Sequence, residues 1–270
     1  MCRGMDFRTS FGRLAELRTH FDAPVVALSA TLTENMCKLI PKQLGLSRPK
    51  KIQLNPDRPN IKLEVKKKPT TNDITVTMEA VYKPELERLQ QEDHEYPVTL
   101  CYMPLEWCSN AQMEAISLFG KPNLETSNYA IFFASQANCV KQYVYEQLKK
   151  PDPTLRLVFC SSAIGMGFDS PCIDRVIHAK PPKRIVDFQQ QIGRAGRKGQ
   201  KAISLLYFDA KDLAQDIEHE MKEYCISNTC LRLCLLKSVG FDTPTRQLTG
   251  CECCSVCIKS CTCGHCATAV

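Results

Sequence analysis

The sequence predicts an α/β protein built on a parallel sheet. From residue 97 onward, short apolar runs alternate with segments whose apolar residues recur at helical spacing. The runs VTLCYM, YAIFFA, LRLVFCSS, RVIHA and KAISLLYF have the length of strands, and the predicted helices are WCSNAQMEAISLF, CVKQYVYEQLKK and VDFQQQIGRAGR. Strands that alternate with helices indicate a parallel sheet covered on both faces. The composition, 44% hydrophobic and 24% charged, is typical of a folded globular chain.

The region before this alternation predicts only part of another α/β layer. FGRLAELRTHF has helical spacing, APVVALSAT at residues 23–31 is an apolar run expected to form a strand, and a helix should follow Thr33 as its N-cap. A single strand between two helices has no neighbouring strands to pair with. Residues 47–69, rich in proline and lysine, read as a connector that enters an extended strand, and residues 76–89 should be helical.

Composition also limits the class of protein. No apolar stretch approaches the length of a membrane span, and the N-terminus has no apolar core of a secretory signal. We therefore expect no membrane partner and a reducing, intracellular location. The formal charge of +6 fits a polyanionic partner, although charge alone is a weak indication.

Cysteine is concentrated near the C-terminus, where ten of the 17 cysteines lie between Cys225 and Cys266, within and after a helical region that begins at AKDLAQDIEHEMKEYC. Cys251, Cys254 and Cys257 form a C-x2-C-x2-C pattern, and Cys230 lies upstream of it. Four thiolates at such spacing favour a tetrahedral structural zinc ion; free or disulfide-linked cysteines are the alternative.

QQIGRAGRKG at residues 190–199 carries Arg194 and Arg197 three residues apart. If the segment is helical, both guanidinium groups share one face and can converge on a single anion, for which a phosphate is the obvious candidate. Upstream, SSAIGMGFDSP at residues 161–171 follows a predicted strand and has the small residues that let backbone amides approach a phosphate.

Together with ALSAT, these segments resemble the motifs of superfamily-two helicases, and more closely those of the RecQ family of DNA helicases. ALSAT is similar to motif III, AIGMGFD to motif V and QQIGRAGR to motif VI. RPNI at residues 58–61 resembles the join between the two RecA-like lobes, and DFRTSFGRLAELR the segment after the DExH box. The resemblance covers nearly the whole chain.

The resemblance implies roles for individual residues. Arg194 and Arg197 would be arginine fingers that stabilise charge on the γ-phosphate of ATP, and Gln190 would sense the same site. The residues that would couple nucleotide state to DNA are Ser29, Thr31, Ser161, Gly165, Gly167 and Asp169. Weaker DNA-binding candidates are Phe7, Arg8, Lys183 and Arg184. Core packing is an equally plausible role for Phe7, and a solvated charged face is equally plausible for Lys183, Arg184 and the run Lys66–Lys68.

Two parts of the ATPase pattern do not occur in the sequence. It has neither GxxxxGKS nor GxxxxGKT, and no DExH box, so ATP and Mg²⁺ would bind productively only if a first lobe supplied these motifs. The isolated chain is expected not to hydrolyse ATP. Three interpretations follow: a fragment of an active helicase, a short non-catalytic DNA-binding zinc protein, or a cysteine-rich metal-handling protein.

CLRLCLLKSVGF followed by the cysteine triplet resembles the RecQ zinc-binding module, and this similarity selects Cys230 as the first ligand rather than Cys225 or Cys234. The CTCGHC tail is not part of that pattern. Its Cys261, Cys263, His265 and Cys266 either form a second metal site, sharing Cys253, or a thiol-rich disordered tail.

The expected organisation is therefore a partial first RecA-like lobe (1–46), a connector (47–69), a RecA-like helicase C-terminal lobe (70–210), and a small helical zinc-binding module with a cysteine-rich tail (211–270). The resemblance implies a 3′→5′ DNA helicase that acts in replication, recombination or repair. Its partner would be single-stranded or forked DNA, and its location would be nuclear.

Overall fold

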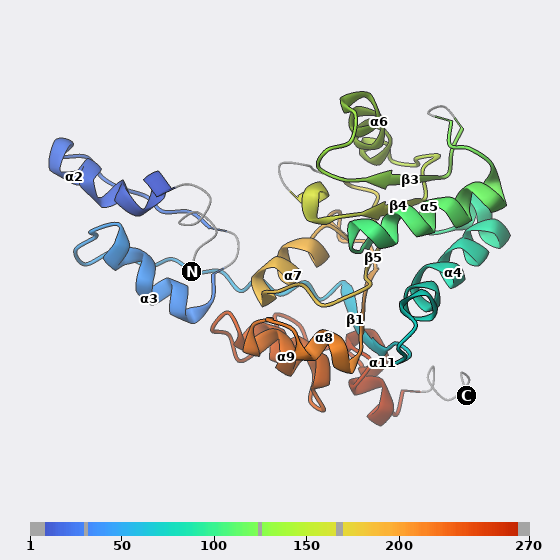
Figure 1. The fold of residues 1–270 in the computed structure, drawn as a ribbon. Helices are drawn as coiled ribbons and strands as arrows, with labels where there is room; N and C mark the ends of the chain where they lie inside the picture. The colour runs from blue at the N-terminus through green and yellow to red at the C-terminus, as the bar shows by residue number, and fades with distance from the viewer. Residues whose placement is uncertain (1–8, 30–31, 124–125, 166–169, 264–270) are drawn as a thin grey trace.

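A six-stranded, fully parallel sheet forms the centre of the molecule in the computed structural model, which describes residues 9–29, 32–123, 126–165 and 170–263 (Figure 1). The strand order is β1-β6-β5-β2-β4-β3. The strands are β1 (Ile61–Lys67), β2 (Thr99–Tyr102), β3 (Tyr129–Phe132), β4 (Leu157–Cys160), β5 (Arg175–His178) and β6 (Ala202–Phe208). The parallel α/β sheet expected from the sequence is confirmed.

Helices cover both faces of the sheet and create two cores. On one face, α4 (Ile74–Glu92) and α5 (Leu105–Phe119) bury Val81 and Trp107 against strand residues such as Cys101. On the other face, α6 (Asn138–Lys149) and α7 (Ile185–Ile192) bury side chains against Leu100 and Tyr102. Successive strand residues point to opposite faces, so the unbroken apolar runs in the sequence reflect burial on both sides.

The N-terminal region stands apart from the sheet, with η1 (Thr9–Glu16), α2 (Leu17–His20) and α3 (Glu34–Gln43) at one end of the molecule (Figure 1). The first predicted helix is mostly a 3₁₀ helix, η1, followed by the four-residue α2. The second predicted helix is present as α3, and the Thr33 hydroxyl accepts a hydrogen bond from the Met36 amide at 3.3 Å as the expected N-cap. The predicted strand at 23–31 is wrong over its described residues 23–29, which form no strand. Val26 and Leu28 are 77% and 90% exposed, because no neighbouring strand is there to accept them.

The predicted connector ends as expected in a strand, β1, which pairs with β6 from Ile61 opposite Ala202 to Lys67 opposite Phe208. Lys68, directly after β1, is buried: its Nζ lies 2.6 Å from Asp212 Oδ2 and donates to the Ala179 carbonyl at 2.9 Å. The interpretation of Lys68 as a DNA-backbone contact is therefore wrong. This lysine instead ties the end of β1 to Ala179, which follows β5, and to Asp212, which follows β6.

The C-terminal region is helical, as predicted, but in short pieces. They are α8 (Ala210–Ala214), α9 (His219–Ile226), α10 (Leu231–Lys237), α11 (Gly250–Cys253) and η4 (Cys257–Ser260). The remaining turns are η2 (Asp93–Glu95) and η3 (Ser162–Gly165). The cysteine-rich segment is attached to the sheet edge, since the Ser255 amide donates to Leu63 O at 2.9 Å and the Val65 amide to Ser255 Oγ at 3.1 Å. No helix among the described residues is long and apolar enough to cross a membrane.

Candidate functional site

The turn that carries the two arginines begins where α7 ends. The expected helix over VDFQQQIGRAGR is wrong in its second half: α7 stops at Ile192, and residues 193–199 form turns. Gly196 adopts φ +62°, and a Cβ there would lie 2.3 Å from Asn60 Nδ2. A left-handed residue interrupts helical geometry. Arg194 and Arg197 are thus placed by a glycine turn, not by a shared helix face.

Arg194 and Arg197 nevertheless line the same pocket, a cavity of about 370 Å³ between the segment before β1, α7 and α10. Arg194 is 8% exposed, whereas Arg197 is exposed and donates from Nε to the Gly193 carbonyl at 3.4 Å. Gln190 also lines this pocket. The three residues predicted to act on the γ-phosphate are therefore brought together.

A third arginine, Arg58, lines the pocket as well. Burial, and then the nearby charge of Arg197, lower the pKa of the Arg58 guanidinium. Like charges gathered in a partly buried cavity favour the binding of an anion, because an anion would relieve their repulsion. We refer to this cavity below as the arginine pocket.

Arg58 and Asn60 also hold the arginine-bearing turn in place. Arg58 Nη2 donates to the carbonyls of Ala195 and Gly196 at 3.2 and 2.7 Å. Asn60 Nδ2 donates to Gly196 O and Gln200 O, both at 2.8 Å. The sequence predicted RPNI only as a join between lobes. Its spacing gave no signal that Arg58 and Asn60 reach a turn more than 130 residues away.

His178, at the end of β5, contacts α7 through Gln191. Its Nε2 lies 2.8 Å from Gln191 Oε1, and its ring stacks on Tyr102 with 5.0 Å between centroids. Burial lowers the pKa of His178 to about 4, so this side chain is neutral near pH 7. A neutral imidazole can position Gln191 without adding charge beside the arginine pocket.

The other predicted coupling residues lie outside the arginine pocket lining or outside the described residues. Ser161 follows β4, its amide donates to Phe132 O at 3.0 Å, and Gly165 ends η3. Ser29 is exposed in the N-terminal region. The structure does not describe Phe7, Arg8, Thr31, Gly167 or Asp169.

The two basic candidates at the start of α7 differ in environment. Lys183 is exposed, which fits a contact with a polyanion. Arg184 forms a two-pronged contact with Asp187, with its Nε and Nη2 donating at 3.0 and 2.8 Å. Part of its hydrogen-bonding capacity is thus engaged inside the protein.

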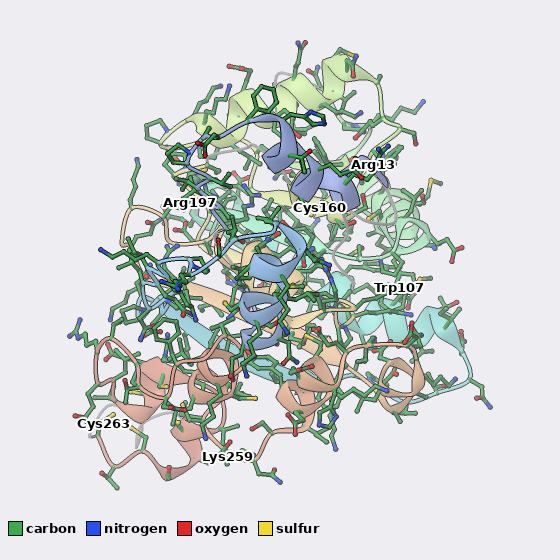
Figure 2. The ribbon with its side chains drawn as sticks, turned by 90° about the vertical axis from the view of Figure 1, so that its left-hand side faces the viewer. Arg13, Trp107, Cys160, Arg197, Lys259 and Cys263 are labelled. Atoms are coloured by element: carbon green, nitrogen blue, oxygen red, sulfur yellow. The ribbon has the colours of Figure 1, made fainter. Side chains whose placement is uncertain are left out.

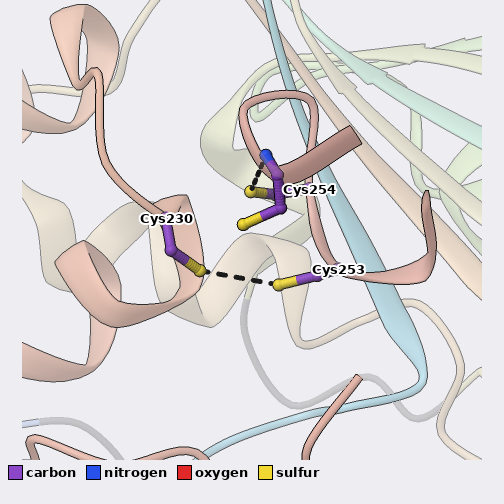
Figure 3. A group of neighbouring side chains, drawn as sticks. Cys230, Cys253 and Cys254 are labelled. Atoms are coloured by element: carbon purple, nitrogen blue, oxygen red, sulfur yellow. Dashed lines mark hydrogen bonds between the residues drawn. The ribbon is translucent and has the colours of Figure 1, made fainter. Parts of the chain in front are cut away.

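Four cysteine sulfurs converge beside α10, all within 4.8 Å of one another: those of Cys230, Cys253, Cys254 and Cys257. The Cys230 and Cys253 sulfurs are 3.5 Å apart, and Cys254 lies beside them (Figure 3). Hydrogen bonds from the thiols of Cys230 and Cys253 lower the pKa of Cys254. Four converging sulfurs, two of them buried, match the ligand set of a closed structural zinc site. We call this group the first thiol cluster.

The first thiol cluster contains Cys253 where the sequence predicted Cys251. The C-x2-C-x2-C spacing favoured Cys251 together with Cys254 and Cys257. The helix α11, however, ends at Cys253, and Cys254 is extended with φ −162° and ψ 168°. This backbone change turns Cys254 away from the side of Cys251. Cys251 lies instead with Cys261 and Cys263.

Arg232 on α10 connects the arginine pocket to the first thiol cluster. It lines the pocket, and its Nη1 lies 2.7 Å from Asp57 Oδ1. Its guanidinium also donates to the carbonyls of Arg58 at 2.9 Å and Ile61 at 2.6 Å. The helix α10, which Cys230 directly precedes, is thereby fixed to the segment that carries Arg58.

Comparison with known proteins identifies the domain that contains Arg194 and Arg197. Residues 108–199 match the helicase conserved C-terminal domain. The mouse bifunctional 3′-5′ exonuclease/ATP-dependent helicase WRN is 30% identical over 98% of this chain, and the ATP-dependent DNA helicase RecQ of Haemophilus influenzae is 25% identical over 94%. The chain spans only 20% and 40% of the lengths of these two relatives.

The fold agrees with a solved helicase structure. Saccharomyces cerevisiae Dbp5 bound to RNA and ADP BeF3 superimposes with a TM-score of 0.54 at 13% identity, covering 79% of this chain and 55% of that one. At this identity the likeness concerns the fold. The six-stranded sheet is that of a RecA-like helicase C-terminal lobe, as the sequence predicted.

Proposed function

We propose that this chain, which matches the helicase conserved C-terminal domain over residues 108–199 and is similar to RecQ-family ATP-dependent helicases, provides the second-lobe half of a 3′→5′ DNA helicase. The observation that carries the proposal is the arginine pocket, where Arg58, Arg194 and Arg197 line one cavity. Preorganised guanidinium groups stabilise the charge that develops during phosphoryl transfer.

Within this proposal, each residue acts on an ATP phosphate from the second-lobe side. Arg194, largely buried, provides a fixed positive charge, and Arg197 is the solvent-exposed finger. Gln190 provides an uncharged contact at the rim of the same pocket. Bound ATP with Mg²⁺ would supply the γ-phosphate, which a P-loop and a DExH box normally hold. The sequence contains neither motif, so we propose that this chain alone does not turn ATP over.

The remaining sequence expectations complete the proposal. Ser161, Gly165, Gly167 and Asp169 couple nucleotide state to the DNA backbone, and Ser29 and Thr31 relay between lobes. Residues 1–46 form part of a first lobe, 47–69 a connector, 70–210 the second lobe and 211–270 a zinc module. The first thiol cluster holds one structural zinc ion, because its four sulfurs leave no position for a reacting ligand.

The proposed partner is DNA, single-stranded or forked, and the proposed setting is replication, recombination or repair in the nucleus. Exposed Lys183 and the net charge of +6 support a polyanionic partner. The relative from Haemophilus influenzae is an ATP-dependent DNA helicase, whereas the solved Dbp5 complex contains RNA. Oligonucleotides of both kinds therefore belong in the test.

The test uses the zinc-loaded chain and three measurements on the same samples. Phosphate release reports ATP hydrolysis, fluorescence anisotropy of labelled single-stranded DNA and RNA reports binding, and calorimetry reports ATP binding. We expect DNA binding, no hydrolysis above the buffer rate, and ATP binding weakened about tenfold by Arg197→Ala. Arg197→Lys should retain part of the affinity, and the exposed Arg246→Ala is the matched control.

Each result decides a separate part of the proposal. DNA-stimulated hydrolysis would contradict the statement that the chain alone does not turn ATP over. Equal ATP affinity in Arg197→Ala and Arg246→Ala would remove the pocket from the mechanism. Strong DNA binding with no ATP binding at all would favour the alternative, a non-catalytic DNA-binding zinc protein. Absence of binding to either nucleic acid would contradict both functions.

A further inference from the structure

A second group of cysteine sulfurs lies beside the first thiol cluster and is separate from it. The sulfurs of Cys251, Cys261 and Cys263 lie within 4.8 Å of one another, with Cys263 at 3.3 Å from both Cys251 and Cys261. All three side chains are half-buried. In Figure 2 Cys263 lies at the edge of the molecule, away from Arg197. We call this group the second thiol cluster.

The backbone builds the second thiol cluster by packing α11 tightly against η4. A Cβ on Gly250 would lie 2.5 Å from Cys257 O and 2.8 Å from Cys261 Cβ, so only glycine permits this approach. The Cys261 amide donates to Ile258 O at 3.2 Å, which closes the turn after η4. Cys251, next to Gly250 in the chain, is thereby placed beside Cys261.

The two clusters divide the cysteines of one short segment between them. Along α11 each residue turns by about 100°, so Cys251 and Cys253 point to nearly opposite sides of the helix. Cys253 then joins the first thiol cluster and Cys251 the second. Neighbouring cysteines that serve two different groups form an interleaved arrangement, and a single zinc ion would leave the second group of converging sulfurs unexplained.

We propose that Cys251, Cys261 and Cys263 are ligands of a second metal ion, for which zinc is the best match. Thiolate sulfurs select soft or borderline divalent cations, and zinc accepts four such ligands in a tetrahedron. The three cysteines supply three positions. For the fourth, the sequence offers His265 and Cys266 within three residues of Cys263. The proposal is independent of the helicase function, because it concerns ligand chemistry alone.

The second ion would stabilise the first site. It would cross-link residue 251 to residues 261 and 263, and so close a loop around Cys253, Cys254 and Cys257. The described cysteines are all thiols, not disulfides, as metal ligation requires. An oxidised Cys251–Cys263 bridge is the competing chemistry for the same two sulfurs.

Zinc content of the whole purified chain tests the proposal, measured by mass spectrometry of the metal together with a thiol count under denaturing conditions. We expect about two zinc ions per chain, and about one in Cys251→Ser, Cys261→Ser and Cys263→Ser. Exposed Cys139→Ser, on α6, should keep both ions and is the matched control. His265→Ala and Cys266→Ser, measured in the same way, identify the fourth ligand.

Cobalt(II) titration gives a second readout that does not depend on zinc retained from expression. The visible absorption of tetrahedral cobalt–thiolate should grow to about two equivalents in the wild type and stop at about one in Cys261→Ser. The proposal is wrong if the wild type binds a single ion that Cys251→Ser abolishes and Cys253→Ser leaves in place. That result would restore the C-x2-C-x2-C site. A Cys251–Cys263 disulfide in protein kept under reducing conditions would also overturn the proposal.

Discussion

Arg232 of α10 and Asp57 of the segment before β1 form a buried ion pair, with 2.7 Å between Nη1 and Oδ1 and side chains only 5% and 1% exposed. The second carboxylate oxygen of Asp57 accepts hydrogen bonds from the Thr245 amide at 2.8 Å and hydroxyl at 2.9 Å. Burial opposes the charge of Arg232, but the hydrogen bond and charge of Asp57 outweigh it and raise the pKa of Arg232. The pair joins the C-terminal module to the segment that carries Arg58.

Removal of one partner of this pair should be strongly destabilising. Asp57→Ala leaves a buried guanidinium without its counter-ion, and such changes typically cost about 3–5 kcal/mol. Urea denaturation of the zinc-loaded protein measures the loss. Asp57→Asn should cost less than Asp57→Ala, because its one carbonyl oxygen can still accept from Arg232, although its amide nitrogen cannot accept the two hydrogen bonds from Thr245.

A surface pair provides the control. Lys149 and Glu146 lie 3.2 Å apart with side chains 59% and 69% exposed, and Lys149→Ala should change the free energy of unfolding by no more than about 1 kcal/mol. Similar losses in Asp57→Ala and Lys149→Ala would show that the buried pair does not hold the module in place.

Gly196→Ala should disturb the arginine pocket. Gly196 and Gly199 both have positive φ, +62° and +85°, but only at Gly196 would a Cβ meet other atoms, with Asn60 Nδ2 at 2.3 Å. Gly199→Ala should therefore cost about 1–2 kcal/mol from backbone strain alone. Gly196→Ala should cost roughly 1–3 kcal/mol more, because Asn60 must move, and should weaken ATP binding.

A double variant checks this explanation. If the clash with Asn60 is the cause, Asn60→Ala should be less damaging in the Gly196→Ala background than in the wild type. Strictly additive free energies of unfolding would mean that the Gly196 effect has another origin.

The sequence alone predicted the sheet because its strands are buried on both faces and leave unbroken apolar runs. Predictions from the sequence were wrong where the local structure depends on residues far away in the chain. The run at 23–29 has the composition of a strand, yet without neighbouring strands its Leu28 is 90% exposed. Periodicity extended α7 through Arg197, since nothing local reveals that Gly196 packs against Asn60. Similarly, cysteine spacing favoured Cys251, whereas the end of α11 places Cys253 in the first thiol cluster.

Stability should fall in mild acid through His178. Its pKa in the folded protein is about 4, against about 6.5 in the unfolded chain. Between these values the unfolded chain binds the extra proton, so stability is complete above about pH 6.5 and decreases as the pH falls toward 4. The full difference corresponds to at most about 3 kcal/mol.

Comparison of variants isolates this contribution from carboxylates and from metal loss, which also respond to acid. The free energy of unfolding is measured from pH 7 to pH 4.5 in the wild type, His178→Gln and His219→Gln, whose side chain is 80% exposed. His178→Gln should have the shallower dependence, and His219→Gln should follow the wild type. Parallel curves for all three proteins would contradict a buried neutral His178.

Zinc removal should release the cysteine-rich segment from the sheet edge without dismantling the sheet. The Ser255 amide donates to Leu63 O and the Val65 amide to Ser255 Oγ, and both bonds depend on the backbone that the first thiol cluster fixes around Cys254. Hydrogen exchange at Ser255 and Val65 should accelerate after chelation, because local opening then costs less free energy. Amides within the buried strands β2 and β5 should keep their protection, since their partners are β4, β6 and each other.

Unchanged exchange at Ser255 in metal-free protein would mean that packing against α10, not the metal, holds the segment. Loss of protection throughout β2 and β5 would instead make the metal a requirement for the whole lobe.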